Sequence, residues 1–138
     1  MAAWLFKTEP SEFSFADLRA KKAARWDGVK NATALIHLRS VKVGDTVVIY
    51  HTGNEKRAIG LAKVVRAPYP DPAHADPKLV VVDLAAGAAL SAPVPLAAFR
   101  ADPLLAQTDL IRITRLSIVP LTAAQLKRVK ELAAAAPR

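Results

Sequence analysis

The pattern of apolar positions along the chain predicts several short strands separated by turns. Thr46–His51 is a run of β-branched and aromatic residues, which is typical of a buried strand. Ala58–Arg66 follows a polar loop and predicts the returning strand of a hairpin. Leu79–Leu84 is apolar almost throughout, which favours a central position in a sheet. Further short strands are expected at Trp4–Phe6, Val94–Leu96 and Leu116–Val119.

Helix starts are marked by residues that can cap free backbone N–H groups. Asn31 precedes a segment at 32–40, and its side-chain oxygen can accept a first-turn N–H of that helix. Ser14 with Asp17 forms a capping pattern for an earlier helix, which should end before Trp26. Trp26 itself is expected on a turn, because Asp-Gly follows it.

The second half of the chain contains fewer clear signals. Thr122 with Gln125 predicts a capping box for a C-terminal helix. Residues 67–78 are rich in proline, which cannot donate to a sheet ladder, so a loop is expected there. The small residues at 85–92 predict a loose turn, and Leu96–Arg100 a single helical turn.

The order of these elements favours an α+β fold. Too few long helices separate the strands for a doubly wound sheet, so a small mixed β-barrel or a curled sheet with peripheral helices is the better prediction. We find no internal repeat and no linker, so residues 1–138 are expected to form a single domain.

Composition adds a strong basic charge. Twenty Lys and Arg against twelve Asp and Glu give a net charge of +8 and a pI near 10.1. Such an excess in a small domain favours a polyanionic partner, most often nucleic acid. Solubility, or the composition of a GC-rich genome, would explain the same excess. The N-terminal segment lacks signal-peptide features and no stretch has the length of a membrane span, so we expect a cytoplasmic protein without membrane contact.

No pattern in the sequence indicates catalysis. The chain has no cysteine, which removes thiolate chemistry and zinc–thiolate sites. The histidines His37, His51 and His74 are scattered, and the glycines form no phosphate-cradling run. We therefore expect no metal, no cofactor and no enzymatic activity.

The candidate binding residues each have a structural alternative. Trp26 could stack on a base or fill the core. Asn31 could read the edge of a base or serve only as a helix cap. Tyr50 and His51 are adjacent on one strand and point to opposite faces, so both line one pocket only if the strand ends or bulges there.

Charged candidates carry the same ambiguity. Lys7 and Glu9 share a face and suit either an ion pair or a paired contact to a ligand. Arg115 shares a face with Ser117 and could bind a phosphate or a nearby carboxylate. The cations expected to contact a nucleic-acid backbone lie on the hairpin and comprise Lys56, Arg57, Lys63 and Arg66.

Six fragments in order resemble the EVE domain, a PUA-like family. The resemblance runs from Trp4 to about Leu132. The fragments are Lys7–Pro10, Trp26–Asn31, Gly44–Asp45, Tyr50–Thr52, Tyr69–Asp71 and Arg115–Pro120. Many members have Arg before the Asn and Tyr after it, whereas this chain has Lys30 and Ala32 there, so an aromatic contribution at that point is lost.

The resemblance implies a PUA-like barrel that holds a modified base, such as a modified cytosine in DNA. The chain is thus expected to be a non-catalytic, monomeric module that binds DNA in preference to RNA. Alternatives are an RNA-binding accessory protein, an enzyme acting on a nucleotide or nucleic acid, and an inert pocket with a protein partner. The ligand-binding residues expected are Lys7, Thr8, Glu9, Trp26, Val29, Asn31, Tyr50, His51, Thr52, Arg115 and Ser117.

Overall fold

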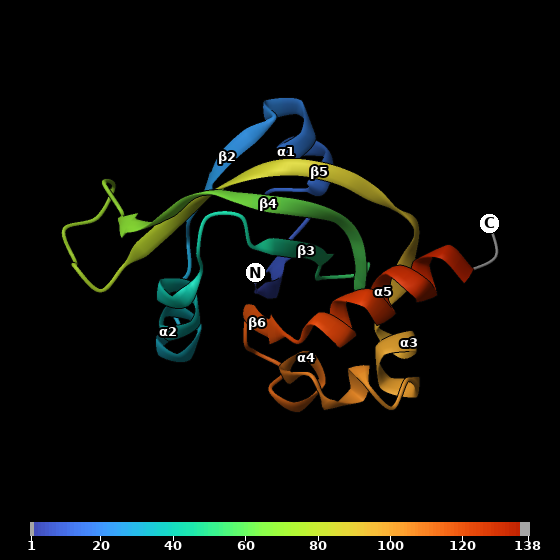
Figure 1. Ribbon diagram of the computed structural model, residues 1–138. Coiled ribbons are helices and arrows are strands. Elements are labelled where there is room, and N and C mark those ends of the chain that lie inside the picture. The colour runs from blue at the N-terminus through green and yellow to red at the C-terminus, as the bar shows by residue number, and fades with distance from the viewer. Residues whose placement is uncertain (1, 136–138) are drawn as a thin grey trace.

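The computed structural model describes residues 2–135 and contains one curved sheet with surrounding helices (Figure 1). The strands are β1 Ala3–Thr8, β2 Ala23–Trp26, β3 Thr46–His51, β4 Arg57–Pro70, β5 Val80–Pro95 and β6 Ile118–Leu121. The helices are α1 Phe15–Lys21, α2 Ala32–Ser40, α3 Leu96–Ala101, α4 Asp109–Arg112 and α5 Ala123–Ala135, with a 3₁₀ turn at Leu105–Gln107.

The sheet is mixed and has the strand order β2-β5-β4-β3-β1-β6. Only the β1–β3 pair is parallel; the other pairs between the described strands are antiparallel. β4 and β5 form long arches, with α1 and β2 above them in the view and the other helices below (Figure 1). The ends of β1 and β2 nevertheless lie close together, since the rings of Phe6 and Trp26 are 5.7 Å apart, centroid to centroid.

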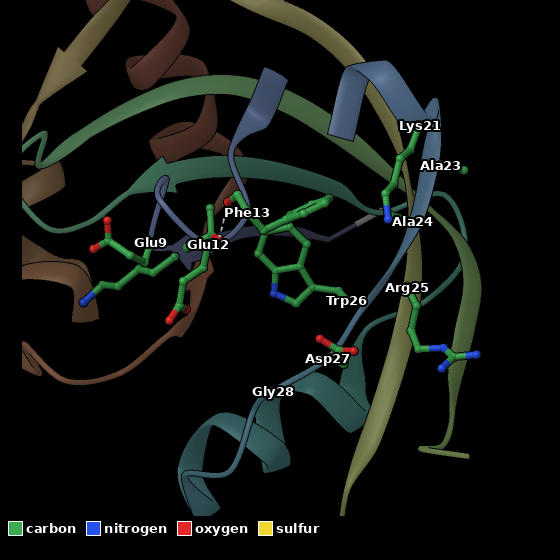
Figure 2. A pocket seen from close by; sticks show the side chains of 12 residues that line it. Glu9, Glu12, Phe13, Lys21, Ala23, Ala24, Arg25, Trp26, Asp27 and Gly28 are labelled. Carbon is green, nitrogen blue, oxygen red and sulfur yellow. Dashed lines mark hydrogen bonds between the residues drawn. The ribbon is translucent and has the colours of Figure 1, made fainter. Parts of the chain in front are cut away.

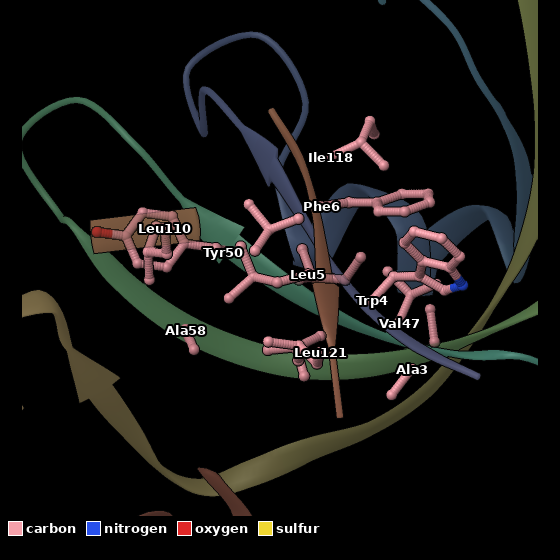
Figure 3. Close-up of a cluster of buried hydrophobic side chains, with 14 of the residues drawn as sticks. Ala3, Trp4, Leu5, Phe6, Val47, Tyr50, Ala58, Leu110, Ile118 and Leu121 are labelled. Atoms are coloured by element: carbon pink, nitrogen blue, oxygen red, sulfur yellow. The ribbon is translucent and has the colours of Figure 1, made fainter. Parts of the chain in front are cut away.

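The core lies around β1 and β3, which are covered on both faces. Leu5 and Phe6 are successive residues of β1 that point to opposite faces, and both are fully buried. Val47 and Val48 of β3 show the same double burial. Figure 3 shows part of this cluster, with side chains of β6 beside those of β1. This packing on both faces fixes the positions of the ends of β1 and β3, from which the loops after Thr8 and His51 begin.

The predicted helix caps are confirmed. Ser14 Oγ accepts from the N–H of Asp17, whose carboxylate accepts from the N–H of Ser14, so the capping box is complete. Asn31 Oδ1 accepts from the N–H of Ala34 at 3.0 Å at the start of α2. Thr122 and Gln125 form the equivalent reciprocal pair before α5. These caps need partners only three residues away, which is why local sequence predicts them.

The expectation of a turn at Trp26 is wrong. Trp26 is the last residue of β2, a strand with no clear sequence signal, and pairs with Val82 of β5. The four residues of β2 lack an apolar alternation, since three of them remain exposed or half-buried. The strand exists because β5 offers it an edge, and this pairing decides where Trp26 lies.

The loop expected at 67–78 is confirmed for residues 71–78 but not for 67–70, and the turn expected at 85–92 is wrong. β4 continues to Pro70 and β5 continues to Pro95. Several register shifts interrupt the pairing of these two strands, including one between Arg66 and Tyr69. Proline is tolerated at such irregularities because ladder hydrogen bonds are already lost there. The bulges also explain how the two strands can bend into an arch.

The α+β prediction is confirmed, but the closed barrel is not. Within residues 2–135, no pairing joins β2 to β6, so the sheet remains open between them. The predicted final strand is shifted by two residues and includes Pro120, which the edge position of β6 permits. Among the residues described, no helix has the length and apolar character needed to cross a membrane.

Candidate functional site

The chain leaving β1 folds into a short, internally bonded loop. The N–H groups of Glu12 and Phe13 both donate to the carbonyl of Glu9, at 3.0 and 2.9 Å. Thr8 Oγ1 donates to the carbonyl of Phe13 at 2.6 Å. Gly53 allows the close approach of Glu9, because a Cβ at this position would lie 2.5 Å from the Glu9 carboxylate. These bonds therefore fix the backbone of the loop at Glu12 and Phe13.

Trp26 and Phe13 form an aromatic wall beside this loop. The ring of Trp26 lies 5.7 Å from that of Phe6 and 6.0 Å from that of Phe13, centroid to centroid, and only 6% of the residue is exposed. Phe13 is half-buried and is the more accessible of the two rings. The chain leaves β2 through Asp27 and Gly28, and the φ of +80° at Gly28 is costly for residues with a Cβ.

Between these segments lies a cavity of about 630 Å³ (Figure 2), called here the aromatic cavity. Its size falls within the range of small-ligand pockets. Its lining residues are Lys7, Thr8, Glu9, Glu12, Phe13, Lys21, Ala23, Ala24, Arg25, Trp26, Asp27 and Gly28. Three of them are cations and three are carboxylates, so the formal charge of the wall is balanced.

Hydrogen-bonding groups in the aromatic cavity are open to a ligand. The indole N–H of Trp26 donates to no acceptor among residues 2–135, and these residues contain no buried side-chain polar atom without a partner, so this N–H is accessible from the cavity. In Figure 2 the indole nitrogen lies on the side of the ring toward Glu12. Glu12 and Asp27 are exposed carboxylates, with no ion pair to another described residue. Besides its three cations, the wall thus offers the indole N–H as a donor and the carboxylates of Glu12 and Asp27 as acceptors, next to the aromatic rings.

A second, smaller cavity adjoins the first through Lys7. It has a volume of about 220 Å³ and is called here the cationic cavity. It is lined by Lys7, Tyr50, Thr52, Gly53, Lys56, Leu96, Arg100, Leu110, Ile111 and Thr114. Three cations and no carboxylate are among these residues. The two cavities therefore differ in charge although they share a wall.

Lys7 is held between the two cavities by its backbone and its side chain. Its N–H donates to the carbonyl of Ser117, and its Nζ donates to the carbonyl of Thr114, both at 2.9 Å. Burial lowers the pKa of the Lys7 ammonium from its ordinary value. Burial likewise raises the pKa of the Tyr50 hydroxyl, against the opposing effect of the Arg100 charge. An anion placed near Lys7 would offset this desolvation.

A model of the EVE domain family matches residues 2–132. The chain belongs to the EVE domain family. The resemblance of the six sequence fragments to this family is confirmed.

Curated and solved relatives agree with this membership. Human thymocyte nuclear protein 1 is 39% identical over 80 residues, which cover 49% of this chain and about a third, 36%, of the human protein. A protein of Rhodopseudomonas palustris is 38% identical with a TM-score of 0.92, covering 100% of this chain and 97% of that one. Human THYN1 protein in complex with 5-methylcytosine-containing DNA is 30% identical with a TM-score of 0.91, covering 99% and 100%.

Seven of the predicted site residues line one or both cavities of this EVE domain. Lys7, Thr8, Glu9 and Trp26 line the aromatic cavity. Lys7 also lines the cationic cavity, together with Tyr50, Thr52 and Lys56. The sequence predicts Lys56 on a hairpin surface that contacts the nucleic-acid backbone. In the structure it lines the cationic cavity. Sequence reasoning thus identified parts of both cavities without separating them.

Other predicted site residues line neither cavity and have structural contacts. His51 is buried, and its Nε2 accepts from the N–H of Phe15 at 3.0 Å, which leaves Nδ1 to donate to Glu55 at 3.0 Å. This hydrogen bond and that of Arg57 lower the pKa of Glu55. Val29 is buried in the core. Asn31 caps α2.

The remaining charged candidates are dispersed. Arg115 is exposed and lines neither cavity, and Ser117 contributes its carbonyl to Lys7. Arg57 lies 3.2 Å from Glu55, which partly neutralises it. Lys63 Nζ donates to Thr46 Oγ1 at 3.1 Å.

Arg66 packs over the ring of Tyr69 at 3.7 Å, away from Lys56. The four hairpin cations thus do not form one surface: Lys56 lines the cationic cavity, and Arg66 lines a separate concavity with Arg25 and Asp83. Among the described residues, no cluster of three or more His, Asp or Glu side chains could hold a metal ion.

Several cavity residues were not predicted. Glu12 and Phe13 lie in the loop after the Lys7–Pro10 fragment, and Asp27 follows Trp26 directly, so nearness to these fragments was the available signal. Lys21 ends α1 just before β2 and Arg25 lies within β2, a strand whose existence the sequence did not indicate. Arg100 of the cationic cavity had no local signal, because α3 meets Lys7 only through the tertiary fold.

Proposed function

We propose that this EVE domain is a non-catalytic module that holds one cytosine, modified at position 5, in the aromatic cavity. The observation that carries the proposal is the match to human THYN1 solved with 5-methylcytosine-containing DNA, which extends over 99% of this chain. DNA is the proposed partner for the same reason. The net charge of +8 supports a nucleic-acid partner independently.

The groups in the aromatic cavity suit a cytosine. Its edge carries an amino group that donates and N3 and O2 atoms that accept. The carboxylate of Glu12 or Asp27 can accept from the amino group, while the indole N–H of Trp26 can donate to N3 or O2. Phe13 is the accessible ring on which the base can stack, a contact that contributes about 1–3 kcal/mol.

A base in a duplex must leave the helix to enter such a cavity. Extrusion costs a few kcal/mol, which stacking and the edge contacts must offset. A binding role rather than a catalytic one is supported by the hydrogen bond of Thr8. Its hydroxyl donates to the Phe13 carbonyl, not to a general base that could activate it as a nucleophile. The function that follows is recognition of an extruded base.

The experiment measures affinities for oligonucleotides that differ at one base. The bases are 5-methylcytosine, cytosine and thymine, in matched DNA and RNA. Burial of one methyl group contributes about 0.8 kcal/mol, so 5-methylcytosine should bind about fourfold tighter than cytosine. Thymine keeps the methyl group but replaces the amino donor by an acceptor, so it should bind at least about tenfold more weakly than 5-methylcytosine.

Two variants assign the contacts. Glu12→Gln and Asp27→Asn each remove the charge of one carboxylate. If that carboxylate accepts from the amino group of cytosine, its replacement should reduce the preference for cytosine over thymine. Lys127→Ala, on the exposed face of α5, is the matched control and should leave this preference unchanged. Equal affinity for the three bases would refute the base-binding proposal, and tighter binding of RNA would refute the assignment to DNA.

A further inference from the structure

The cationic cavity has the donor chemistry of an anion site. Lys7, Lys56 and Arg100 bring three positive charges to a volume of about 220 Å³ with no carboxylate among its lining residues. Ammonium and guanidinium groups can only donate hydrogen bonds. The hydroxyl of Tyr50 makes no hydrogen bond to another described residue and lines the same cavity, so it can also donate. A base edge needs acceptors as well, so this wall suits an anion better than a base.

The backbone at Lys56 has an unusual conformation and is bonded to the start of α3. Lys56 has a φ of +48°, in the left-handed region that residues with a Cβ adopt at an energetic cost. Its carbonyl accepts from the N–H of Leu96 at 2.9 Å, which ties the loop to the start of α3. Arg100 lies on the same helix, one turn further along. The contact thus holds two of the three cations on connected segments.

Lys7 connects this cavity to the aromatic one. Its side chain lines both, and the Thr114 carbonyl fixes its ammonium near the boundary. A group bound in the cationic cavity is therefore a close neighbour of a ligand in the aromatic cavity. In a nucleotide, the group adjoining the base and sugar is a phosphate.

We infer that the cationic cavity is a phosphate subsite, which binds the backbone phosphate next to the nucleotide whose base enters the aromatic cavity. This inference rests on the proposed function, and it assigns backbone contacts to Lys7, Lys56 and Arg100 rather than to the hairpin cations as a group. Arg57, Lys63 and Arg66 each face other protein groups. The subsite would fix the position of the extruded nucleotide without reading its sequence.

The test removes one phosphate charge at a time. DNA oligonucleotides with a single 5-methylcytosine carry a neutral methylphosphonate linkage on its 5′ or its 3′ side. With the wild-type protein, one of the two positions should weaken binding by about tenfold, because a charge-assisted contact is lost. With Lys56→Gln or Arg100→Gln, the same linkage should weaken binding clearly less than it does in the wild type, because one of its three cationic partners is already missing.

Controls separate the possible outcomes. Lys130→Gln removes an exposed charge on α5 and should retain the full effect of the neutral linkage. Equal effects in wild type and both cavity variants would overturn the subsite. Inorganic phosphate serves as a second probe: if it binds at Lys56 and Arg100 while neither neutral linkage matters, the cavity is a free-anion site and the backbone assignment is wrong.

Failure of the base proposal would look different. If the three bases bound equally but the linkage effect still depended on Lys56 and Arg100, the phosphate subsite would stand and the base assignment would fall. If the preference for one base persisted but neither neutral linkage weakened binding, the base assignment would stand and the phosphate subsite would fall. Salt dependence gives an independent check, since loss of one phosphate contact should reduce the logarithmic slope by about 0.7–0.9.

Discussion

The aromatic and cationic cavities share Lys7 but differ in the charge of their lining residues. The aromatic cavity combines ring surfaces with equal numbers of cations and carboxylates, so it can both donate and accept hydrogen bonds. The cationic cavity has three cations and no carboxylate among its lining residues. A balanced wall discriminates between chemical edges, whereas a uniformly positive wall attracts any phosphate. Under the two proposals above, the aromatic cavity recognises the base and the cationic cavity holds its backbone phosphate.

The strongest test of the comparison is Trp26→Ala. The ring is buried against Phe6 and Phe13, so its removal should lower the free energy of unfolding by about 3–5 kcal/mol. Thermal or denaturant unfolding measures this directly. Trp26→Phe keeps an aromatic ring but loses the indole N–H, and should recover much of the stability without the cytosine preference. An unchanged melting temperature in Trp26→Ala would show that the ring does not support the aromatic cavity.

Phe13→Ala should affect binding more than stability. Its half-buried ring is the accessible stacking surface, so affinity for the 5-methylcytosine oligonucleotide should fall by about 1–3 kcal/mol. Fluorescence anisotropy at fixed salt measures the change, with Phe13→Leu as the control that keeps apolar volume. Full affinity in Phe13→Ala would place the base elsewhere. The linkage effect at Lys56 and Arg100 should persist in this variant.

Lys7→Met tests the residue that the cavities share. Loss of the ammonium should weaken modified and unmodified DNA alike by about tenfold, or about 1.4 kcal/mol. Stability should stay equal or rise, because burial disfavours the charge of Lys7. Since the pKa of Lys7 is lowered on folding, the unfolded chain binds the proton more tightly, and any stability advantage of the variant should narrow as pH rises toward 10.5.

A widening of that advantage with rising pH would contradict the stated effect of burial on Lys7. Urea unfolding of both proteins at several alkaline pH values provides the comparison. A change in affinity confined to the methylated oligonucleotide would show that Lys7 reads the base rather than the charge.

The smallest expected effect is a control remote from both cavities. Thr122→Ala removes the cap at the start of α5 and should lower the free energy of unfolding by about 1 kcal/mol. Binding measured by anisotropy should not change, because neither cavity contains α5. Altered base or linkage preference in this variant would mean that loss of stability by itself disturbs the site, which would weaken conclusions drawn from the cavity variants.

The sequence by itself determined the features that depend on near neighbours. The three helix caps require a partner three residues away, and the buried strand β3 requires only its own run of apolar residues. The ordered family fragments also pointed to Lys7, Thr8, Glu9 and Trp26, which prove to lie around one cavity. These parts of the fold and site could be predicted without knowledge of the topology.

The tertiary structure alone decided which side chains meet. β2 forms because β5 supplies its partner edge, and that pairing carries Trp26 into the core beside Phe13. Arg100 reaches the neighbourhood of Lys7 from a helix more than ninety positions away in the chain. Local sequence preferences cannot predict these long-range contacts, because they depend on the order of the strands in the sheet and on the bulges that bend β4 and β5. The two cavities therefore exist only in the folded chain, although their residues are visible in its sequence.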